Sequence, residues 1–333
     1  MKKFLALLMA VVMIAALCAC GAQQTGAAAT AAPTAAPESN VKLQILCEQD
    51  DSMLNTYSLL AVNPKAPFKD ADGKAVSGVA INTAGAAALI NWLLSADTEK
   101  LAAGYGQDKY GQQLFYLLDK APVSTAAIPA PTDATKTIRL STTTSVNDSG
   151  LLDYLLPQFE EKYGYKVEVT AAGTGKAIAN AECGNADLIL VHAKTQEEAF
   201  VTAGYSYVLD GFESERLSFL YNYFVLCGPA NDPAGVKKAA SVKDAFKLIA
   251  DGKYPFVSRG DKSGTHTKEV TLWPAELGIT TDADSVANYT AWYIYSNAGM
   301  GACLTMANEK GAYILSDKAT FLTFVANNGA VTS

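Results

Sequence analysis

From Val41 onward, short apolar runs alternate with longer stretches in which apolar residues recur every three or four positions. The short runs predict β-strands, and the four apolar residues Leu188–Val191 are typical of a strand buried on both faces. The longer stretches predict helices, as over Thr83–Leu101 and Ser149–Tyr163. Further strands are predicted at 41–46, 59–62, 137–140, 167–170, 221–227 and 255–257, and further helices at 174–183, 197–203, 242–249, 265–277 and 299–308. This alternation indicates an α/β fold whose mixed sheets are covered by helices on both faces.

The first forty residues do not follow this pattern. Residues 1–20 begin with a charged end, continue with an apolar run too short for a membrane span, and end in Cys18-Ala19-Cys20 before Gly21. This ending resembles the lipobox of bacterial lipoproteins, with Cys20 as the lipidated residue; an ordinary secretory signal cleaved nearby is the alternative. Residues 21–40 are rich in Ala, Thr and Pro and predict a flexible tether. We therefore expect an exported protein anchored to the outer face of the cytoplasmic membrane.

Composition narrows the class of partner. A chain of 333 residues, 50% hydrophobic and 18% charged, is long enough for two domains with buried cores. Its formal net charge of −7 argues against nucleic acid as a partner, because phosphate backbones select a basic surface. The same charge does not exclude a small anion, since donors inside a pocket decide such binding and net charge mainly tunes encounter rates.

Cysteine and histidine spacing gives no sign of a metal centre. The cysteines beyond the signal segment are Cys47, Cys183, Cys227 and Cys303. Each lies in or beside an apolar run, so buried free thiols are expected, with one disulfide as an alternative that the sequence leaves open. The only histidines, His192 and His266, have no neighbouring cysteine or histidine at zinc-site spacing. We expect structural histidines, no metal cation ligands and no cofactor.

Three segments concentrate Ser, Thr and Gly where a predicted strand gives way to a predicted helix. We call them the first, second and third donor segments: Ser141–Ser145, Gly173–Lys176 and Ser258–His266. The start of a helix leaves main-chain N–H groups unpaired and carries a partial positive charge, so it attracts anions. Hydroxyl side chains add donors, glycine lets the backbone approach a ligand, and Arg259 adds a charged fork of donors. The segments therefore predict a receptor for a small oxyanion, beyond the carboxyl ends of the strands.

These residues resemble the tungstate-binding proteins of bacterial ABC importers. The likeness extends from Thr137 to about Phe324. The motifs that carry it, in shared order, are Thr142-Thr143-Thr144-Ser145, Asp148-Ser149-Gly150-Leu151-Leu152-Asp153, Phe159-Glu160-Glu161-Lys162-Tyr163-Gly164, Gly173-Thr174-Gly175, Phe256-Val257-Ser258-Arg259-Gly260-Asp261, Ser263-Gly264-Thr265-His266 and Met306-Ala307-Asn308-Glu309-Lys310-Gly311-Ala312-Tyr313. The resemblance implies the type II periplasmic-binding-protein fold, in which each of two lobes is a mixed sheet flanked by helices.

The resemblance also implies a ligand and a site. The ligand would be a tetrahedral oxyanion, tungstate or molybdate, held between the lobes. The implied ligand-binding residues are Thr143, Thr144, Ser145, Thr174, Gly175, Arg259, Ser263, Gly264 and Thr265. Tungstate and molybdate carry no proton at neutral pH and need donors alone. The protein would act as a monomer, touch the membrane only through its lipid anchor, and deliver the anion to an ABC permease and its ATPase.

The order of the chain departs from the family pattern. Residues from about Leu43 to Leu118 resemble the family's carboxyl-terminal part, placed before its amino-terminal part. The chain is therefore interpreted as a circular permutant; an unrelated insertion is the alternative. Such rearrangement is tolerated where termini are exposed and close together. The expected division is 41–54 as a strand of the second lobe, 55–118 in the first lobe, 119–136 as a linker, 137–222 in the first lobe and 223–333 in the second lobe.

Two other functions stay open from the sequence. A phosphate or sulfate receptor is one, because a protonated phosphate needs an acceptor that Asp148 or Asp261 would supply. An exported hydrolase using Ser263 and His266 is the other. Those two residues are only three positions apart at a helix start, and the chain has no Gly-x-Ser-x-Gly nucleophile motif. We therefore expect a binding protein, not an enzyme.

Overall fold

Ten strands hydrogen-bond into one sheet within residues 40–329, the part of the chain that this computed structural model describes. The strands are β1 Leu43–Cys47, β2 Leu54–Ala61, β3 Tyr116–Leu117, β4 Thr137–Thr143, β5 Lys166–Ala172, β6 Leu188–Val191, β7 Leu217–Pro229, β8 Phe256–Ser258, β9 Tyr293–Tyr295 and β10 Tyr313–Asp317. Their order is β5-β4-β6-β2-β7-β10-β8-β9, with β1 and β3 also paired to β7. Because β4 is parallel to β5 and β6 while β2 is antiparallel to β6 and β7, the mixed α/β fold is confirmed.

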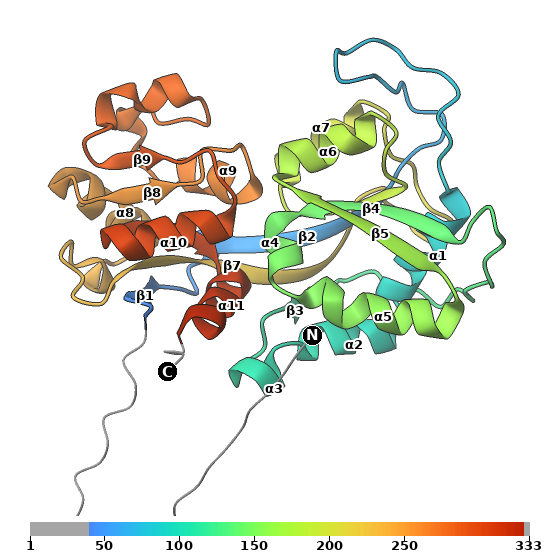
Figure 1. The fold of residues 1–333 in the computed structure, drawn as a ribbon, viewed down its shortest axis with the longest axis horizontal. Helices are drawn as coiled ribbons and strands as arrows, with labels where there is room; N and C mark the ends of the chain where they lie inside the picture. The colour runs from blue at the N-terminus through green and yellow to red at the C-terminus, as the bar shows by residue number, and fades with distance from the viewer. Residues whose placement is uncertain (1–39, 330–333) are drawn as a thin grey trace, which may run out of the picture. The chain divides into compact units, whose positions relative to one another are not determined.

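Strand β7 joins two regions of this sheet. Residues 217–223 of β7 pair with β2, and residues 224–229 pair with β10 and β1. We call the region around β5-β4-β6-β2 the first lobe and the region around β10-β8-β9 the second lobe. Figure 1 shows β4, β5 and their helices at one end of β2 and β7, and β8, β9, α8 and α10 at the other. The α-helices are α1 Thr83–Leu93, α2 Ala96–Gly104, α3 Gln107–Tyr110, α4 Thr144–Asp148, α5 Leu151–Tyr163, α6 Thr174–Glu182, α7 Lys194–Thr202, α8 Val242–Gly252, α9 Gly264–Val270, α10 Met300–Lys310 and α11 Lys318–Asn328.

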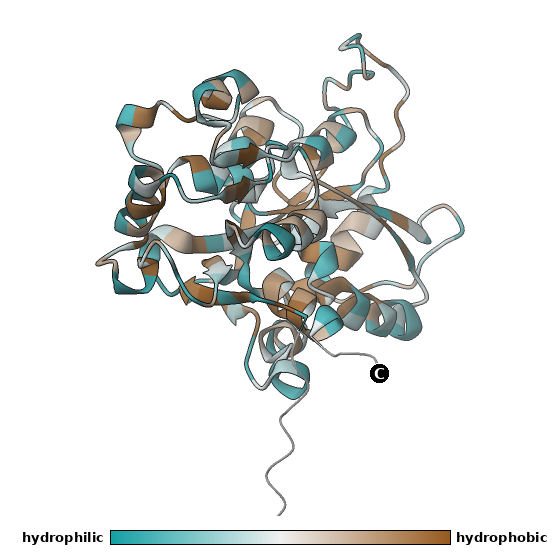
Figure 2. Cartoon of the chain, turned by 60° about the vertical axis from the view of Figure 1, so that its left-hand side comes forward, coloured by the Kyte–Doolittle hydropathy of each residue, from teal (hydrophilic) through white to brown (hydrophobic). Residues whose placement is uncertain are grey.

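Apolar side chains pack on both faces of the sheet. In β6, Leu188 and Leu190 belong to one cluster with α1 and α5, whereas Ile189 and Val191 belong to another with α6 and α7. Successive side chains of a strand point to opposite faces, so the predicted strand buried on both faces is confirmed. In the second lobe, Phe256 and Val257 divide between two clusters in the same way. Figure 2 shows the hydrophobic colour concentrated on the strands and on the helix turns beside them.

Several predicted boundaries are wrong for local reasons. The single helix predicted over 83–101 is two helices, because the Ser95 N–H and hydroxyl both donate to the Trp92 carbonyl and end α1. The helix predicted to reach Leu277 stops at Val270, before Pro274, which cannot continue a helix. Strand β2 begins five residues before its predicted start at 59, while β10 and α11 were missed.

Membrane-spanning helices, metal centres and disulfides were also considered in the sequence analysis. The helices within residues 40–329 include none with the length and hydrophobicity of a transmembrane span, and no group of three or more His, Cys, Asp or Glu in this part is placed to hold a metal ion. The four cysteines of this part are free thiols, with Cys227 and Cys303 buried. Cys47 and Cys183 are only half-buried, so the expectation of buried thiols is wrong for these two. Cys20, the signal peptide and the tether up to residue 39 lie outside the described residues.

Candidate functional site

The three donor segments lie where the sequence predicted a change from strand to helix. The first joins β4 to α4, the second joins β5 to α6, and the third joins β8 to α9. The first two are neighbours because β4 and β5 are parallel and paired up to Thr143 and Ala172. The third segment belongs to the second lobe and contacts both of the others. A guanidinium Nη2 of Arg259 donates to Thr144 Oγ1 at 3.1 Å, and the main-chain N–H of Gly264 donates to Thr174 Oγ1 at 3.1 Å.

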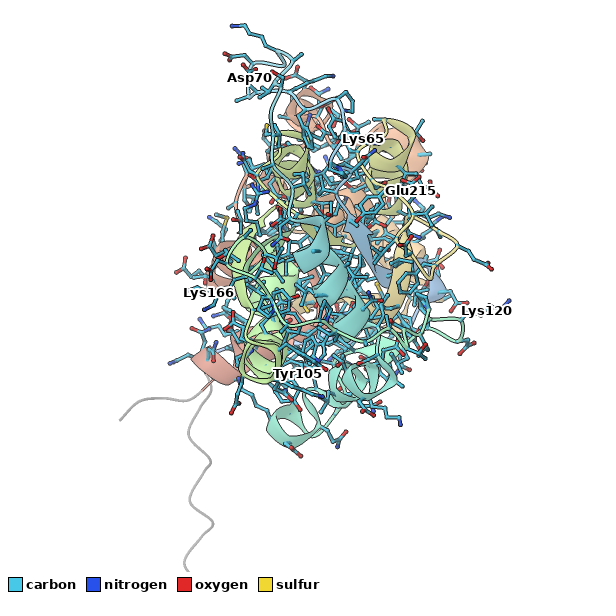
Figure 3. The ribbon with its side chains drawn as sticks, turned by 90° about the vertical axis from the view of Figure 1, so that its right-hand side faces the viewer. Lys65, Asp70, Tyr105, Lys120, Lys166 and Glu215 are labelled. Carbon is cyan, nitrogen blue, oxygen red and sulfur yellow. The ribbon has the colours of Figure 1, made fainter. Side chains whose placement is uncertain are left out.

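Arg259 is the charged centre of this arrangement. The lysines Lys65, Lys120 and Lys166 point outward from the first lobe (Figure 3), whereas Arg259 is only 2% exposed. One oxygen of Asp261 accepts from its Nη2 at 2.5 Å, and the other accepts from the Ser263 N–H at 3.1 Å. Within the described part of the chain, Arg259 Nε has no hydrogen-bond partner. A buried charged donor without a partner is costly, so this N–H is suited to an anionic ligand.

The donor segments also bring several hydroxyl groups together. Thr144 and Thr174 accept the two bonds already described, and the Ser263 hydroxyl accepts from the His266 N–H as the N-cap of α9. A hydroxyl that accepts one bond still has its own hydrogen to donate. The Thr265 hydroxyl is buried and has no partner among the described residues. Donors from both lobes therefore converge on one buried region.

The Ser145 hydroxyl has a different role, which follows from its neighbours. The Asn55 side-chain N–H donates to Asp317, so its carbonyl oxygen faces His192 Nδ1 at 2.8 Å and fixes that nitrogen as the donor. His192 Nε2 must then accept, and the Ser145 hydroxyl donates to it at 2.9 Å. Burial, with the charge of Arg259 adding to it, lowers the pKa of His192 to about 3, so the ring is neutral. In this arrangement Ser145 has only its main-chain N–H to offer an anion.

The same polar network continues into the second lobe. Asp317 is fully buried and accepts from Tyr57 OH at 2.5 Å and from Asn222 Nδ2 at 2.8 Å. It also caps α11 by accepting from the Thr320 N–H, and the Thr320 hydroxyl donates to the Ser145 carbonyl at 3.3 Å. Sequence reasoning missed this network, because its members lie on β2, directly after β6, on β7, at the end of β10 and on α11, far apart along the chain.

His266 does not form a catalytic pair with Ser263. The Lys262 N–H donates to His266 Nδ1 at 3.0 Å, so the neutral ring carries its hydrogen on Nε2. That buried Nε2 is without a partner in residues 40–329. Burial lowers the pKa of His266 to about 4. The Ser263 hydroxyl meets the main-chain N–H of His266 instead of its ring, which is a helix cap and not an activated nucleophile.

Glycine is required at a close contact between the two lobes. A Cβ on Gly264 would lie 2.8 Å from His192 Cε1, and a Cβ on Gly173 would lie 3.3 Å from Asp261 Oδ2. Gly175 has ordinary space, since its Cβ would be 3.6 Å from Gln196 Oε1. The absence of a side chain at Gly264 therefore lets the third donor segment pack against His192.

Comparison with known proteins places the chain in a family. The profile of the PBP superfamily domain matches residues 126–333. The tungstate-binding protein TupA of Peptoclostridium acidaminophilum is 46% identical over 200 residues, which are 60% of this chain and 65% of that protein. A putative ABC transporter anion-binding protein of Haloferax volcanii is 44% identical over 189 residues, 57% of this chain and 51% of that protein.

A solved structure is also similar. The tungstate ABC transporter structure from Geobacter sulfurreducens shares 41% identity over 58% of this chain and 77% of its own, with a TM-score of 0.46. The chain spans less than two thirds of the length of the two curated relatives, the proteins of Peptoclostridium acidaminophilum and Haloferax volcanii. Because the family profile covers more than half of its residues, the chain belongs to the PBP (periplasmic-binding-protein) superfamily.

Proposed function

We propose that this protein captures a tetrahedral oxyanion, tungstate or molybdate, between its two lobes and delivers it to an ABC permease and its ATPase. The observation that carries the proposal is the buried Arg259, whose Nε lacks a partner among residues 40–329 while its Nη2 donates to a hydroxyl of the opposite lobe, that of Thr144. The names of the two curated relatives, a tungstate-binding protein and an anion-binding protein of an ABC transporter, support it.

The donor chemistry favours a fully deprotonated anion. Asp148 is exposed, and both oxygens of Asp261 already accept hydrogen bonds from Arg259 and Ser263. Neither carboxylate predicted as an acceptor for a protonated phosphate is thus free within the donor cluster. Each charge-assisted bond to the anion contributes roughly 1.5–3 kcal/mol, so a few of them are enough for tight binding. The nine residues named from the sequence are the proposed ligand-binding set, with Ser145 acting through its N–H.

Contacts across the two lobes suggest how binding is signalled. Arg259 to Thr144 and Gly264 to Thr174 are bonds between lobes, and an anion that bridges the same groups would strengthen the closed arrangement. A closed, loaded form is what the permease would recognise.

We also infer that the chain is circularly permuted. Residues 40–125 precede the family match, yet β2 lies between β6 and β7 in the sheet and β1 pairs with β7. Side chains of α1 and β2 share one apolar cluster with those of β4 and α5. Residues 119–136 contain no helix or strand, as a linker between old ends would require. These contacts favour an integral part of the fold over an unrelated insertion.

Calorimetry with tungstate, molybdate, sulfate and phosphate tests the proposal. Submicromolar binding of tungstate or molybdate is expected, with sulfate and phosphate at least about a hundredfold weaker. If phosphate binds as tightly as tungstate or more tightly, phosphate is the ligand instead of tungstate. If none of the four anions binds, the proposed receptor function is wrong.

The proposed cellular location has a separate test. Export and lipid anchoring through Cys20 predict that Cys20→Ser releases the protein from the membrane fraction. Unchanged membrane association with continued fatty-acid labelling would contradict the anchor.

A further inference from the structure

A cleft of about 530 Å³ lies beside the donor cluster. Strand β2, the turn that leads into α7, and helix α9 form its walls. Two of its lining residues also belong to the site: His192, which accepts the Ser145 hydroxyl, and Gly264, which donates to Thr174. The cleft is therefore separated from the donors by the contact between His192 and Gly264.

The charged groups of the cleft are cations. Lys194, Arg216 and Lys268 line it, and no carboxylate does. Arg216 is ion-paired with the buried Glu197, and Lys194 pairs with Glu198 at 3.6 Å in an exposed position.

Lys268 differs from the other two. Its Nζ donates to the Ser52 carbonyl at 2.9 Å, and its half-buried ammonium forms no ion pair with a carboxylate of residues 40–329. Burial lowers its pKa. On a protein with a net charge of −7, this cleft presents an uncompensated positive charge beside the site.

We propose that this cleft is an outer anion site, in which Lys268 holds an arriving oxyanion before it passes between His192 and Gly264 to the inner donors. This inference rests on the proposed function. The inner groups are closed to solvent, since Ser145, Arg259 and Thr265 are 1%, 2% and 1% exposed. An anion reaches them only when the lobes part, and the seam between the turn before α7 and helix α9 is itself a wall of the cleft.

The bonds that close this seam beside the cleft are weak. The Gln196 side-chain N–H donates to both the Lys262 carbonyl and the Thr267 hydroxyl, each at 3.4 Å. Thr56, Thr195 and Thr267 line the cleft and offer hydroxyls that replace part of the water shell of an anion. Among the cations that line the cleft, Lys268 alone has no ion pair with a carboxylate of residues 40–329. With this cation and neutral hydroxyls, the outer site takes any small deprotonated oxyanion, and discrimination is left to the inner donors.

The test is the rate of tungstate binding, followed by rapid filtration with radiolabelled tungstate. Lys268→Gln should slow association about tenfold at low ionic strength and leave the dissociation rate unchanged, because steering by charge acts on encounter. In about 0.5 M NaCl the difference should nearly vanish, since screening shortens the reach of the charge to a few ångströms. Lys268→Arg should keep most of the rate.

Lys247→Gln is the matched control. Lys247 lies on α8, is exposed and pairs with Asp251, so its loss makes the same change in net charge away from the cleft. If Lys268→Gln binds tungstate as fast as Lys247→Gln, the outer site is wrong. It is also wrong if Lys268→Gln changes only the dissociation rate.

A second variant keeps the inference testable if Lys268→Gln fails to fold. Thr271→Lys adds a cation at an exposed lining position, and it should speed association about threefold at low salt. No acceleration in Thr271→Lys would contradict the outer site. Failure of the wild-type protein to bind any of the four anions in calorimetry would instead defeat the proposed function, and this inference with it.

Discussion

The two lobes contribute unlike donors to the same site. In the first lobe, the oxygens of Thr143, Thr144, Ser145 and Thr174 all have protein hydrogen-bond partners. In the third donor segment, of the second lobe, four buried polar atoms have none within the described residues: Ser258 Oγ, Arg259 Nε, Thr265 Oγ1 and His266 Nε2. The first lobe's part of the site is complete as it stands, whereas the second lobe's part presents polar groups that a further molecule would satisfy.

This difference has an energetic consequence. Each buried polar group without a partner costs about 1–3 kcal/mol. The third donor segment is therefore the least favourable part of the site in the absence of ligand. An anion that accepts from Arg259 and Thr265 would repay part of that cost, and we expect binding to stabilise the second lobe more than the first.

The largest expected effect is on Arg259. Arg259→Gln removes the buried charged donor of the cluster, and oxyanion affinity should fall roughly 100- to 1000-fold, or about 3–4 kcal/mol. Arg259→Lys should recover only part of this loss, because a lysine cannot reproduce the planar fork that contacts Thr144 and Asp261. Calorimetry with tungstate measures both variants.

Asp261→Asn serves as the control variant for Arg259→Gln. It keeps the guanidinium but replaces the charged partner that holds it, so affinity should fall much less than in Arg259→Gln. Unchanged affinity in Arg259→Gln, with a normal circular dichroism spectrum, would remove Arg259 from the site and with it the contrast between the lobes.

The next effect concerns the contact between lobes. Gly264→Ala would place a Cβ 2.8 Å from His192 Cε1 and 3.2 Å from the His192 carbonyl oxygen. The ring cannot move aside easily, since Ser145 and Asn55 hold its two nitrogens. We expect closure to be hindered and affinity to fall about 30-fold, or about 2 kcal/mol.

Gly301→Ala is the matched control for this change. Gly301 is also in a helix, and a Cβ there would meet nothing within 4 Å. Its affinity should match that of the wild type, and its stability should rise slightly, because alanine favours the helix. Equal affinities for the two alanine variants would mean that the seam at Gly264 is not tight.

The local sequence pattern was sufficient to predict where the donor segments lie, and insufficient to predict which of their side chains pair with one another. The strand-to-helix junctions at all three donor segments are predictable, because small polar residues follow short apolar runs there. The bond of Arg259 to Thr144 joins residues 115 positions apart, and only resemblance to a family suggested it.

The network behind Ser145 could not be predicted at all. Asn55 and His192 are 137 positions apart, and the polar start of β2 at Asn55 does not follow an alternating strand pattern. Which hydroxyl keeps a hydrogen for a ligand depends on such tertiary partners. Sequence therefore predicted the three donor segments that the structure brings into contact, but not that the Ser145 hydroxyl is committed to His192.

A pair of threonines tests the contrast between lobes directly. Thr265→Val removes a hydroxyl without a protein partner within the described part of the chain, so stability without ligand should stay level or rise by about 1 kcal/mol, while affinity falls about tenfold. Thr143→Val removes the N-cap that accepts from the Val146 N–H, so it should lose about 1 kcal/mol of stability. Denaturant unfolding and calorimetry separate the two. Equal losses of stability would contradict the view that only the second lobe's part of the site is incomplete.

The smallest effect comes from two carboxyls, for which the contrast between the lobes reverses. Glu99, in α2 of the first lobe, has an oxygen without a partner in the described chain, whereas Glu269, in α9, accepts from Trp273 Nε1 and Tyr293 OH. Burial raises the pKa of each to about 7 from 4.5. A carboxyl with a raised pKa binds more protons folded than unfolded, so the free energy of unfolding falls as pH rises from about 4.5 through 7.

Replacing Glu99 removes its contribution to the fall in the free energy of unfolding at high pH. Glu99→Gln should stabilise the protein by about 1 kcal/mol at pH 8 and by much less at pH 5, because the charged form that it eliminates is scarce at the lower pH. Glu269→Gln should stabilise less at pH 8, since it exchanges a charged acceptor of two hydrogen bonds for a weaker neutral one. Urea unfolding at the two pH values measures both. A Glu99→Gln variant that gains as much at pH 5 as at pH 8 would mean that removal of the ionised form is not the source of its stability.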